Sequence, residues 1–245
     1  MLTKTTAIVL RNKKYGETSC IVTMLTRTYG VQTYMVNGVR KSTKKTAGTG
    51  MYFQPANILS MVVYHNSLKQ LQRIKTFNFY IIYNNIQQHA IKNMIALFIT
   101  EILYLCLKQP EENEEIYDFA EDIFTCLDHA DAPTTANLPL YFLIHLSNVM
   151  GFVIQNNYSS SHTILNLQEG VFTTLTPTHI NYAPQNVAVQ ISHLLKIQHP
   201  TELSQLQLQA ANRRLIIDVL LQYYSLHITG FGMPKSLAVL KEVLA

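Results

Sequence analysis

Hydrophobic and polar residues alternate with a period of two through the first eighty residues of the chain. Short β-branched stretches of this kind, ended by glycine or polar turns, are typical of β-strands. In the first stretch the alternation places Val9, Arg11 and Lys13 on one face. The whole pattern predicts five strands, at Thr5–Lys14, Ser19–Leu25, Val31–Val36, Ile58–Tyr64 and Leu68–Lys75.

Five short strands in so small a segment fit a closed or nearly closed barrel, and the OB-fold is the five-stranded candidate. The strands are interrupted at 37–50, which holds three glycines and four basic residues but no apolar stripe. We therefore expect a mobile loop there, without the helix that often lies between the third and fourth strands of this fold.

After Phe77 the hydrophobic period changes to 3.6, which is typical of helices. A broad apolar stripe runs from Ile86 to Leu105, and a later helix is expected from Asn137, as its cap, to Met150, with Pro139 in the first turn. Further helices are expected at 116–127, from about 186, at 210–227 and at 234–244.

The segment 152–184 lacks helical signals, and its pattern predicts a hairpin formed by Thr163–Leu167 and Val171–Leu175. We therefore expect an α+β chain of two domains. An OB-fold domain would cover residues 1–78, and a mostly helical domain would cover 79–245 with an insertion at about 152–184.

The charge of the chain changes sign near the same predicted domain boundary. Residues 1–80 hold twelve Lys and Arg against one acid, a net charge of +11, and residues 81–245 hold seven against fourteen, a net charge of −7. A basic block of domain size is typical of a module that binds a polyanion. The alternative is a solvated basic face without a ligand.

Basic residues stand beside aromatic ones in this block, and such pairs bind single strands by neutralising phosphates and stacking bases. Alternation also places Lys69, Arg73 and Lys75 on one face of the fifth strand. Packing in the barrel core is the alternative for each aromatic residue. The candidate DNA-binding residues are Arg11, Lys13, Lys14, Arg27, Tyr34, Arg40, Lys41, Lys44, Lys45, Lys69, Arg73 and Lys75.

Catalytic motifs are not found: the chain has no H-E-x-x-H, no G-x-S-x-G and no phosphate-binding loop. The acids between Glu111 and Asp122 could serve a metal-dependent nuclease, although a solvated helix start explains them more simply. We expect no enzyme activity.

Three widely spaced cysteines predict neither a disulfide framework nor a zinc site, so no metal or cofactor is expected. Neither a signal peptide nor a membrane span is expected, and a cytoplasmic location is the simplest interpretation.

A second basic group lies near the C-terminus, on helices that are otherwise apolar. A basic rim beside an apolar groove can hold an acidic peptide that ends in a hydrophobic residue. Ordinary surface charge is the alternative. The residues of this group are Arg213, Arg214, Lys235 and Lys241.

Several segments resemble the RecO family of bacterial DNA repair and recombination mediators. At the N-terminal end these are Ile8-Val9-Leu10-Arg11, Tyr15-Gly16-Glu17, Ile21-Val22-Thr23, Leu25-Thr26-Arg27 with Gly30, and Gly38-Val39-Arg40-Lys41 followed by Phe53-Gln54-Pro55. At the C-terminal end they are the helix from Arg213 to Tyr223 and Lys235-Ser236-Leu237.

The resemblance implies an N-terminal OB-fold and a helical C-terminal domain. It implies binding of single- and double-stranded DNA, strand annealing at the nucleoid, and help in loading RecA onto DNA coated by single-strand-binding protein. The implied partners are RecR and the acidic C-terminal tail of the single-strand-binding protein. Some members bind zinc through four cysteines, and 152–184 has none here. An OB-type RNA-binding or translation-associated module is the alternative function.

Overall fold

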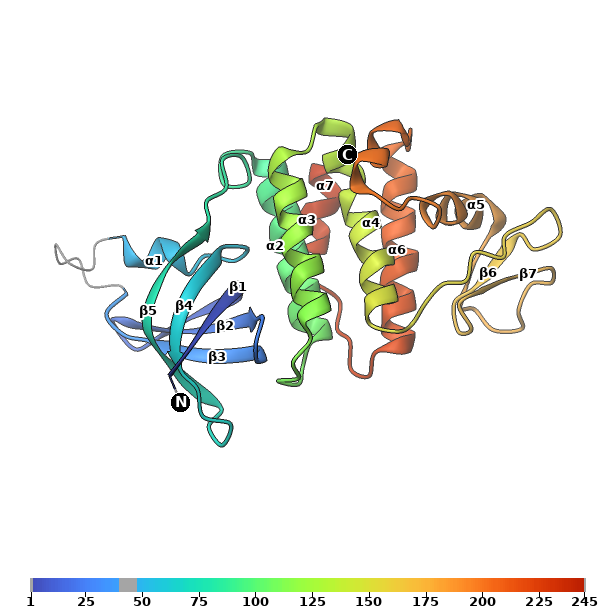
Figure 1. The fold of residues 1–245 in the computed structure, drawn as a ribbon. Coiled ribbons are helices and arrows are strands. Elements are labelled where there is room, and N and C mark those ends of the chain that lie inside the picture. Colours follow the sequence, from blue (N-terminus) through green and yellow to red (C-terminus); the bar gives the residue numbers. More distant parts are fainter. Residues whose placement is uncertain (1, 40–47, 245) are drawn as a thin grey trace. The chain divides into compact units, whose positions relative to one another are not determined.

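The computed structural model describes residues 2–39 and 48–244. The chain divides into two compact units, Met1–Asp128 and His129–Ala245. The first unit combines a β-barrel with one short and two longer helices among the described residues, and the second is mostly helical (Figure 1). The boundary at residue 78, drawn from the sequence, stays a prediction, because compactness alone does not define where one domain ends.

The barrel is closed and its strands follow the order β1-β2-β3-β5-β4. All neighbouring pairs are antiparallel except β3 and β5, which run parallel. The predicted five-stranded OB-like barrel is therefore confirmed. Its strands are β1 (Leu2–Tyr15), β2 (Ser19–Thr26), β3 (Gly30–Val36), β4 (Ile58–Tyr64) and β5 (Leu71–Ile81).

A β-bulge in β1 changes which side chains face the barrel core. The pairing with β2 skips Leu10, so that Val9 pairs with Met24 and Arg11 with Thr23. Val9 is fully buried in the core, whereas Arg11 is exposed. The prediction that Val9 and Arg11 share a face is wrong, because the extra residue reverses the alternation.

A short helix, α1 (Thr49–Tyr52), lies between β3 and β4. The sequence predicted a loop without a helix at 37–50, and this prediction is wrong for Thr49 and Gly50, which belong to α1. Residues 40–47 of the expected loop lie outside the described residues. The Tyr52 ring stacks on Phe79 with centroids 4.3 Å apart, and Phe53 is fully buried. The helix thus packs Tyr52 against the barrel core, and its C-cap residue Phe53 belongs to that core.

Two helices, α2 (Ala90–Cys106) and α3 (Glu114–His129), complete the first unit. Helix α2 packs against β1. Ile8 and its strand partners Leu25 and Ile58 are buried although they face away from the barrel interior. One part of the outer barrel wall is therefore covered.

Polar side chains fix the ends of these helices. The buried Asp128 carboxylate accepts hydrogen bonds from the N–H groups of Asn84, Asn85 and Ile86, at 2.7–2.9 Å. Asn113 accepts one from the N–H of Ile116 at 2.9 Å, which caps α3. The segment from β5 into α2 is thus fastened to the end of α3.

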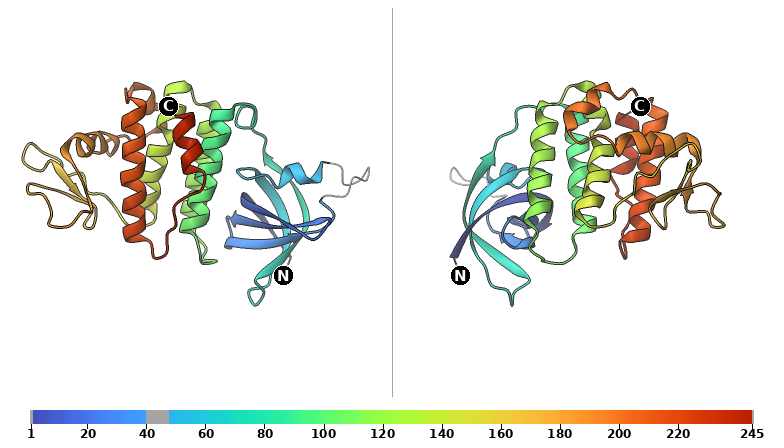
Figure 2. Two further views of the ribbon diagram at one scale, coloured as in Figure 1. Left: turned by 180° about the vertical axis from the view of Figure 1, so that it is seen from behind. Right: turned by 45° about the vertical axis from the view of Figure 1, so that its right-hand side comes forward.

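The second unit contains α4 (Ala132–Val149), α5 (Gln185–Leu194), the 3-10 helix η1 (Pro200–Gln205), α6 (Ala210–His227) and α7 (Leu237–Val243). Helices α4 and α6 lie side by side, and a small sheet projects beyond α5 (Figure 2). The sheet has the order β7-β6-β8. Its strands are β6 (Ile164–Asn166), β7 (Val171–Thr173) and β8 (Tyr182–Ala183), so the predicted hairpin is confirmed and gains a third strand.

Helix α4 begins earlier than the sequence predicts. Asp131 is its N-cap and accepts a hydrogen bond from the N–H of Thr134 at 2.9 Å. Asn137 lies inside the helix and is buried, where its side-chain amide donates to the carbonyl oxygens of Leu203 and Leu206. The prediction of Asn137 as the cap is therefore wrong, and its polar group instead joins α4 to η1.

Candidate nucleic-acid interface

One row of strand partners crosses all five strands on the outside of the barrel. We call it the open row; in spatial order it consists of Lys13, Ile21, Met35, Arg73 and Tyr64. The neighbours of these residues along β2 and β3 fill the barrel core, so the row itself faces outward. Ile21 and Met35 are half-buried, and the other three side chains are exposed.

The open row combines cations with an aromatic side chain. Tyr64 is 51% exposed and is the direct strand partner of Arg73. Neither Lys13 nor Arg73 forms an ion pair within the described residues. Free cations beside an accessible ring can neutralise phosphates while the ring stacks on a base. The chemistry of the row therefore suits a nucleic-acid strand.

Two hollows lie beside the row. The smaller, of about 510 Å³, is lined by Met35, Tyr64 and Arg73, among others. The larger, of about 790 Å³, is lined by Tyr29 and Lys108 together with β3 residues. Lys69, in the loop 65–70 between β4 and β5, lines both hollows. This loop thus stands between two concave surfaces.

The sequence predicted that Lys69, Arg73 and Lys75 alternate regularly along one face of β5, and the structure contradicts this. The strand begins at Leu71, so Lys69 belongs to the preceding loop. Lys75 falls at a register shift, because Val63 pairs with Ile74 and Val62 with Thr76. Of the three, only Arg73 keeps a regular strand position, although all three side chains are exposed.

Arg11 and Lys14 lie on β1 on either side of Lys13, and both are exposed. The Arg11 guanidinium donates to the hydroxyl of Tyr104 at 3.2 Å and lies 5.2 Å from the centroid of that ring. Arg11 is therefore partly engaged by α2. Lys14 pairs with Cys20, whose side chain points into the barrel, so Lys14 lies on the opposite side of β1 from Lys13.

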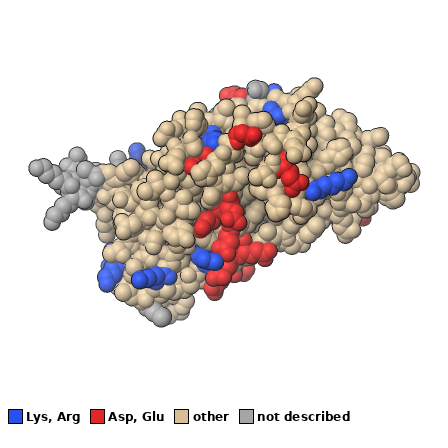
Figure 3. All heavy atoms as spheres, turned by 45° about the horizontal axis from the view of Figure 1, so that its top comes forward, with Lys and Arg blue, Asp and Glu red and all other residues tan. Residues whose placement is uncertain are grey.

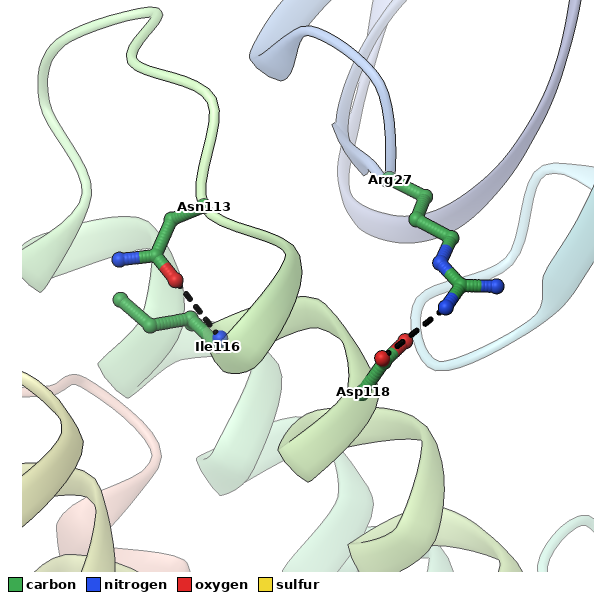
Figure 4. A network of polar contacts seen from close by, with 4 residues as sticks. All are labelled: Arg27, Asn113, Ile116 and Asp118. Carbon is green, nitrogen blue, oxygen red and sulfur yellow. Dashed lines mark hydrogen bonds and ion pairs between the residues drawn. The ribbon is translucent and has the colours of Figure 1, made fainter.

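Arg27 is held by an ion pair within the barrel unit. Its Nη2 lies 3.0 Å from Oδ2 of Asp118 on α3, and the two side chains are about half exposed, at 48% and 49% (Figure 4). Figure 4 also shows the Asn113 cap of the same helix. Arg27 thus has an internal counterion with which a phosphate would compete.

Tyr34 is fully buried in the barrel core. Burial raises the pKa of its hydroxyl well above the usual value, and the hydroxyl has no hydrogen-bond partner among the described residues. A ring in this position cannot stack on a base, so the structure contradicts its place among the interface candidates. Tyr64 is an accessible tyrosine of the open row, and its position at the end of a predicted strand was the available signal.

The remaining barrel candidates, Arg40, Lys41, Lys44 and Lys45, lie outside the described residues. Their part in an interface stays a prediction.

The second basic group is partly engaged by its own helices. Arg213 donates to the carbonyl oxygen of Leu208, and Lys241 on α7 forms an ion pair with Asp218 on α6. Asp218 lies one helical turn beyond Arg214, so an acid sits within the group. Desolvation by burial, and secondarily Arg214, lowers the pKa of Arg213.

The negative charge of the chain is concentrated on α3 and on the loop 107–113 that precedes it. Residues 81–128 carry nine acids and two lysines, whereas 129–245 carry five acids and five bases. Eight of these nine acids lie in α3 or in the loop before it, whereas α2 holds one acid and one lysine. The excess of acids therefore belongs to α3 and that loop, in the same unit as the basic barrel. Figure 3 shows acidic side chains massed in one patch, with basic side chains at its edge and scattered elsewhere on that face.

Within residues 2–39 and 48–244 no group of three or more His, Cys, Asp or Glu is placed to hold a metal ion. Over the same residues no helix combines the length and the apolar character needed to cross a membrane.

Known proteins match the chain along its whole length. Residues 1–80 match the family described as Recombination protein O N terminal, and 87–237 match Recombination protein O C terminal. The chain is 32% identical to DNA repair protein RecO of Flavobacterium psychrophilum, with all of both chains covered. It is 32% identical to that of Christiangramia forsetii and 29% to that of Azobacteroides pseudotrichonymphae, with 99% of each chain covered. The chain therefore belongs to the RecO family of DNA repair proteins.

Proposed function

We propose that this protein binds single- and double-stranded DNA through the outer wall of its barrel and acts by binding rather than by catalysis. The observation that carries the proposal is the open row, in which Lys13 and Arg73 flank two apolar side chains and Tyr64 lies directly beside Arg73 on the outer surface of the barrel. The family membership supports DNA as the polyanion. Lys14, Lys69 and Lys75 add positive charge to the barrel surface.

Strand annealing follows from the same charge. Two complementary strands repel each other through their phosphates, and a surface that neutralises phosphates on both lowers this repulsion. The barrel segment, with a net charge of +11 over residues 1–80, supplies such a surface. We infer that the protein anneals complementary strands in the cytoplasm, at the nucleoid.

The proposal extends to protein partners. The basic group on α6 and around α7 is the candidate site for the acidic tail of the single-strand-binding protein, because Lys235 is exposed and Arg213, Arg214 and Lys241 are half-exposed. RecR is the second expected partner, and help in loading RecA the expected outcome. Binding of a tail peptide to the protein and to an Arg213→Ala/Arg214→Ala variant tests the site; equal affinity would exclude these arginines.

Fluorescence anisotropy of labelled oligonucleotides at several salt concentrations tests the proposal directly. Single-stranded DNA affinity should fall as salt rises, with a slope in log–log form of about −0.7 for each phosphate neutralised. Replacing Arg40, Lys41, Lys44 and Lys45 by Ala should weaken binding to all DNA sequences alike. A slope near zero would contradict the electrostatic interface.

Competition and incubation experiments address the alternatives. A strong preference for RNA over single-stranded DNA of the same sequence would favour an RNA-binding module. Cleavage of labelled DNA in the presence of Mg²⁺ or Mn²⁺ would show that the acids of α3 act as a nuclease site. Annealing of complementary strands without cleavage is the expected result.

A further inference from the structure

Leu68 is the side chain on which the further inference depends. It lies in the loop 65–70 between β4 and β5, and 92% of its surface is exposed. Single exposed apolar residues are ordinary on proteins. Leu68 differs from such residues because the loop that carries it is fixed in place.

The loop is fastened from inside by Gln72, which is only 2% exposed. The Gln72 side-chain amide donates to the carbonyl oxygens of Asn66 and Lys69, at 2.8 and 2.6 Å, and its Oε1 accepts from the N–H of Asn66. The Asn66 side chain accepts from the N–H of Leu68 at 2.9 Å. The backbone on both sides of Leu68 is therefore held, and the leucine is presented at a defined position.

Cations and hollows surround this apolar tip. Lys69 follows Leu68 directly, is exposed, and lines both hollows. Leu68 itself lines the larger hollow, and Arg73 of the open row lines the smaller. At the base of the loop the His65 ring stacks on Tyr29, with centroids 3.7 Å apart. A strand that crosses the loop would meet cations near its phosphates and an apolar side chain near its bases.

We propose that Leu68 is a wedge that inserts between two adjacent bases of a bound DNA strand. This inference rests on the proposed function and deepens it. Insertion of an aliphatic side chain partly unstacks the bases and buries apolar surface on both partners. Because the loop is already fixed, little conformational freedom is lost on binding.

The wedge confers a preference that phosphate contacts cannot supply. Pyrimidine–purine steps such as TA unstack more readily than others. DNA with such a step at the wedge position is therefore bound more tightly than DNA of equal length and charge that lacks one.

Oligonucleotides that carry 2-aminopurine beside a TA step test the wedge, because this base fluoresces more strongly once it is unstacked. Binding of the full-length protein should raise the fluorescence. Leu68→Ala should weaken affinity about ten-fold, or about 1.4 kcal/mol, and should remove the rise in fluorescence even at saturating protein. Leu68→Phe should keep both.

Two variants serve as matched controls. Ile82→Ala removes another exposed aliphatic side chain, 74% accessible and outside the loop, and should change neither readout. Lys69→Ala should weaken affinity but leave the fluorescence rise at saturation. If Leu68→Ala melts at a lower temperature than the wild type, Leu68→Gln, which keeps the side-chain length, replaces it in the comparison.

The outcomes separate the wedge from the proposed function. A Leu68→Ala protein that binds DNA and unstacks the bases as the wild type does overturns the wedge and leaves DNA binding in place. Weaker binding with an unchanged fluorescence rise also overturns the wedge. A wild-type protein that binds no DNA overturns the proposed function itself.

Discussion

Lys13 on β1 and Arg73 on β5 belong to one continuous row of strand partners, joined through Ile21 and Met35. The two cations are far apart in sequence, and the barrel topology places them on one outward surface. The row at Ile8, Leu25 and Ile58 also faces away from the interior but is buried. The open row is therefore a part of the wall at which charge is accessible.

Removal of either cation should weaken DNA binding without changing its sequence preference. For Lys13→Ala and Arg73→Ala we expect the salt slope of single-strand affinity to become shallower by about 0.7 each, if each side chain neutralises one phosphate. Anisotropy titrations at four salt concentrations measure this slope. Lys196→Ala, at an exposed position in the second unit, is the control and should leave the slope unchanged. If the slope of Lys13→Ala and of Arg73→Ala also equals that of the wild type, the open row is not part of the interface.

Removal of the charge on Asp118 should strengthen DNA binding, because Arg27 then loses its internal counterion. An exposed ion pair is worth less than about 1 kcal/mol, so Asp118→Asn should raise affinity by at most about five-fold and lower stability little. Glu169→Gln makes the same change of net charge at an exposed site in the second unit. If the two substitutions raise DNA affinity equally, the change of net charge explains the effect, and the release of Arg27 does not.

Gly30 should tolerate no side chain. Its φ is +59°, and a Cβ at this position would lie 2.0 Å from the carbonyl oxygen of Glu111. We expect Gly30→Ala to destabilise the protein by about 2–4 kcal/mol, from the strained backbone and the clash together. Gly16 has the same φ with nothing within 4 Å, so Gly16→Ala should cost only about 1–2 kcal/mol. Similar melting temperatures of the two variants would contradict the close contact.

Period-two alternation was sufficient to predict the five strands, because a barrel that is filled on one side imposes this pattern. It could not predict the bulge at Leu10, since an inserted residue leaves the composition of the strand unchanged while it reverses the faces that follow. The helix start at Asp131 was missed for a related reason. Asn137 is a good capping residue type, but tertiary hydrogen bonds to η1 use its side chain instead.

Charge predicted the basic barrel, but it did not show that most of the acids lie in the same compact unit as the barrel, which extends to Asp128. Tyr34 was wrongly predicted to bind DNA, because the sequence alone does not say which face of β3 points into the barrel core. Tyr64 meets Arg73 through the β4–β5 pairing, and the row from Lys13 reaches Arg73 through the β3–β5 pairing, a parallel contact between strands distant in sequence.

Acid should weaken the second unit through His145. Its ring lies 3.9 Å from that of Tyr141, and Nε2 lies 3.0 Å from the carbonyl oxygen of Ile197. Burial lowers the pKa of His145, although the Ile197 contact opposes the shift. The folded pKa is therefore below the unfolded value of about 6.5, so this contribution to stability is present above about pH 6.5 and is lost as the pH falls through the folded pKa.

The measurement is the free energy of unfolding of the wild type and of His145→Gln at pH 7.5 and at pH 5.5. We expect the wild type to lose more stability on acidification than the variant, in which this position does not titrate. An identical loss in both proteins would assign the acid sensitivity to other groups.

Gln72 should support both the fold and the interface. Its side chain makes three hydrogen bonds to the backbone of Asn66 and Lys69 while it is itself 2% exposed. Gln72→Leu keeps the volume but leaves those backbone groups without their partner, which costs about 1–3 kcal/mol where they stay buried. Chemical denaturation measures this loss.

The same substitution also separates a fixed loop from a merely exposed one. A released loop must be ordered when DNA binds, and fixing one residue costs roughly 1–2 kcal/mol of conformational entropy, so Gln72→Leu should weaken single-strand affinity although residue 72 faces the barrel interior. Gln70→Leu, an exposed position in the same loop, is the control. Lower stability with full DNA affinity would mean that the position of Leu68 need not be fixed in advance, because binding itself would then order the loop at no measurable cost.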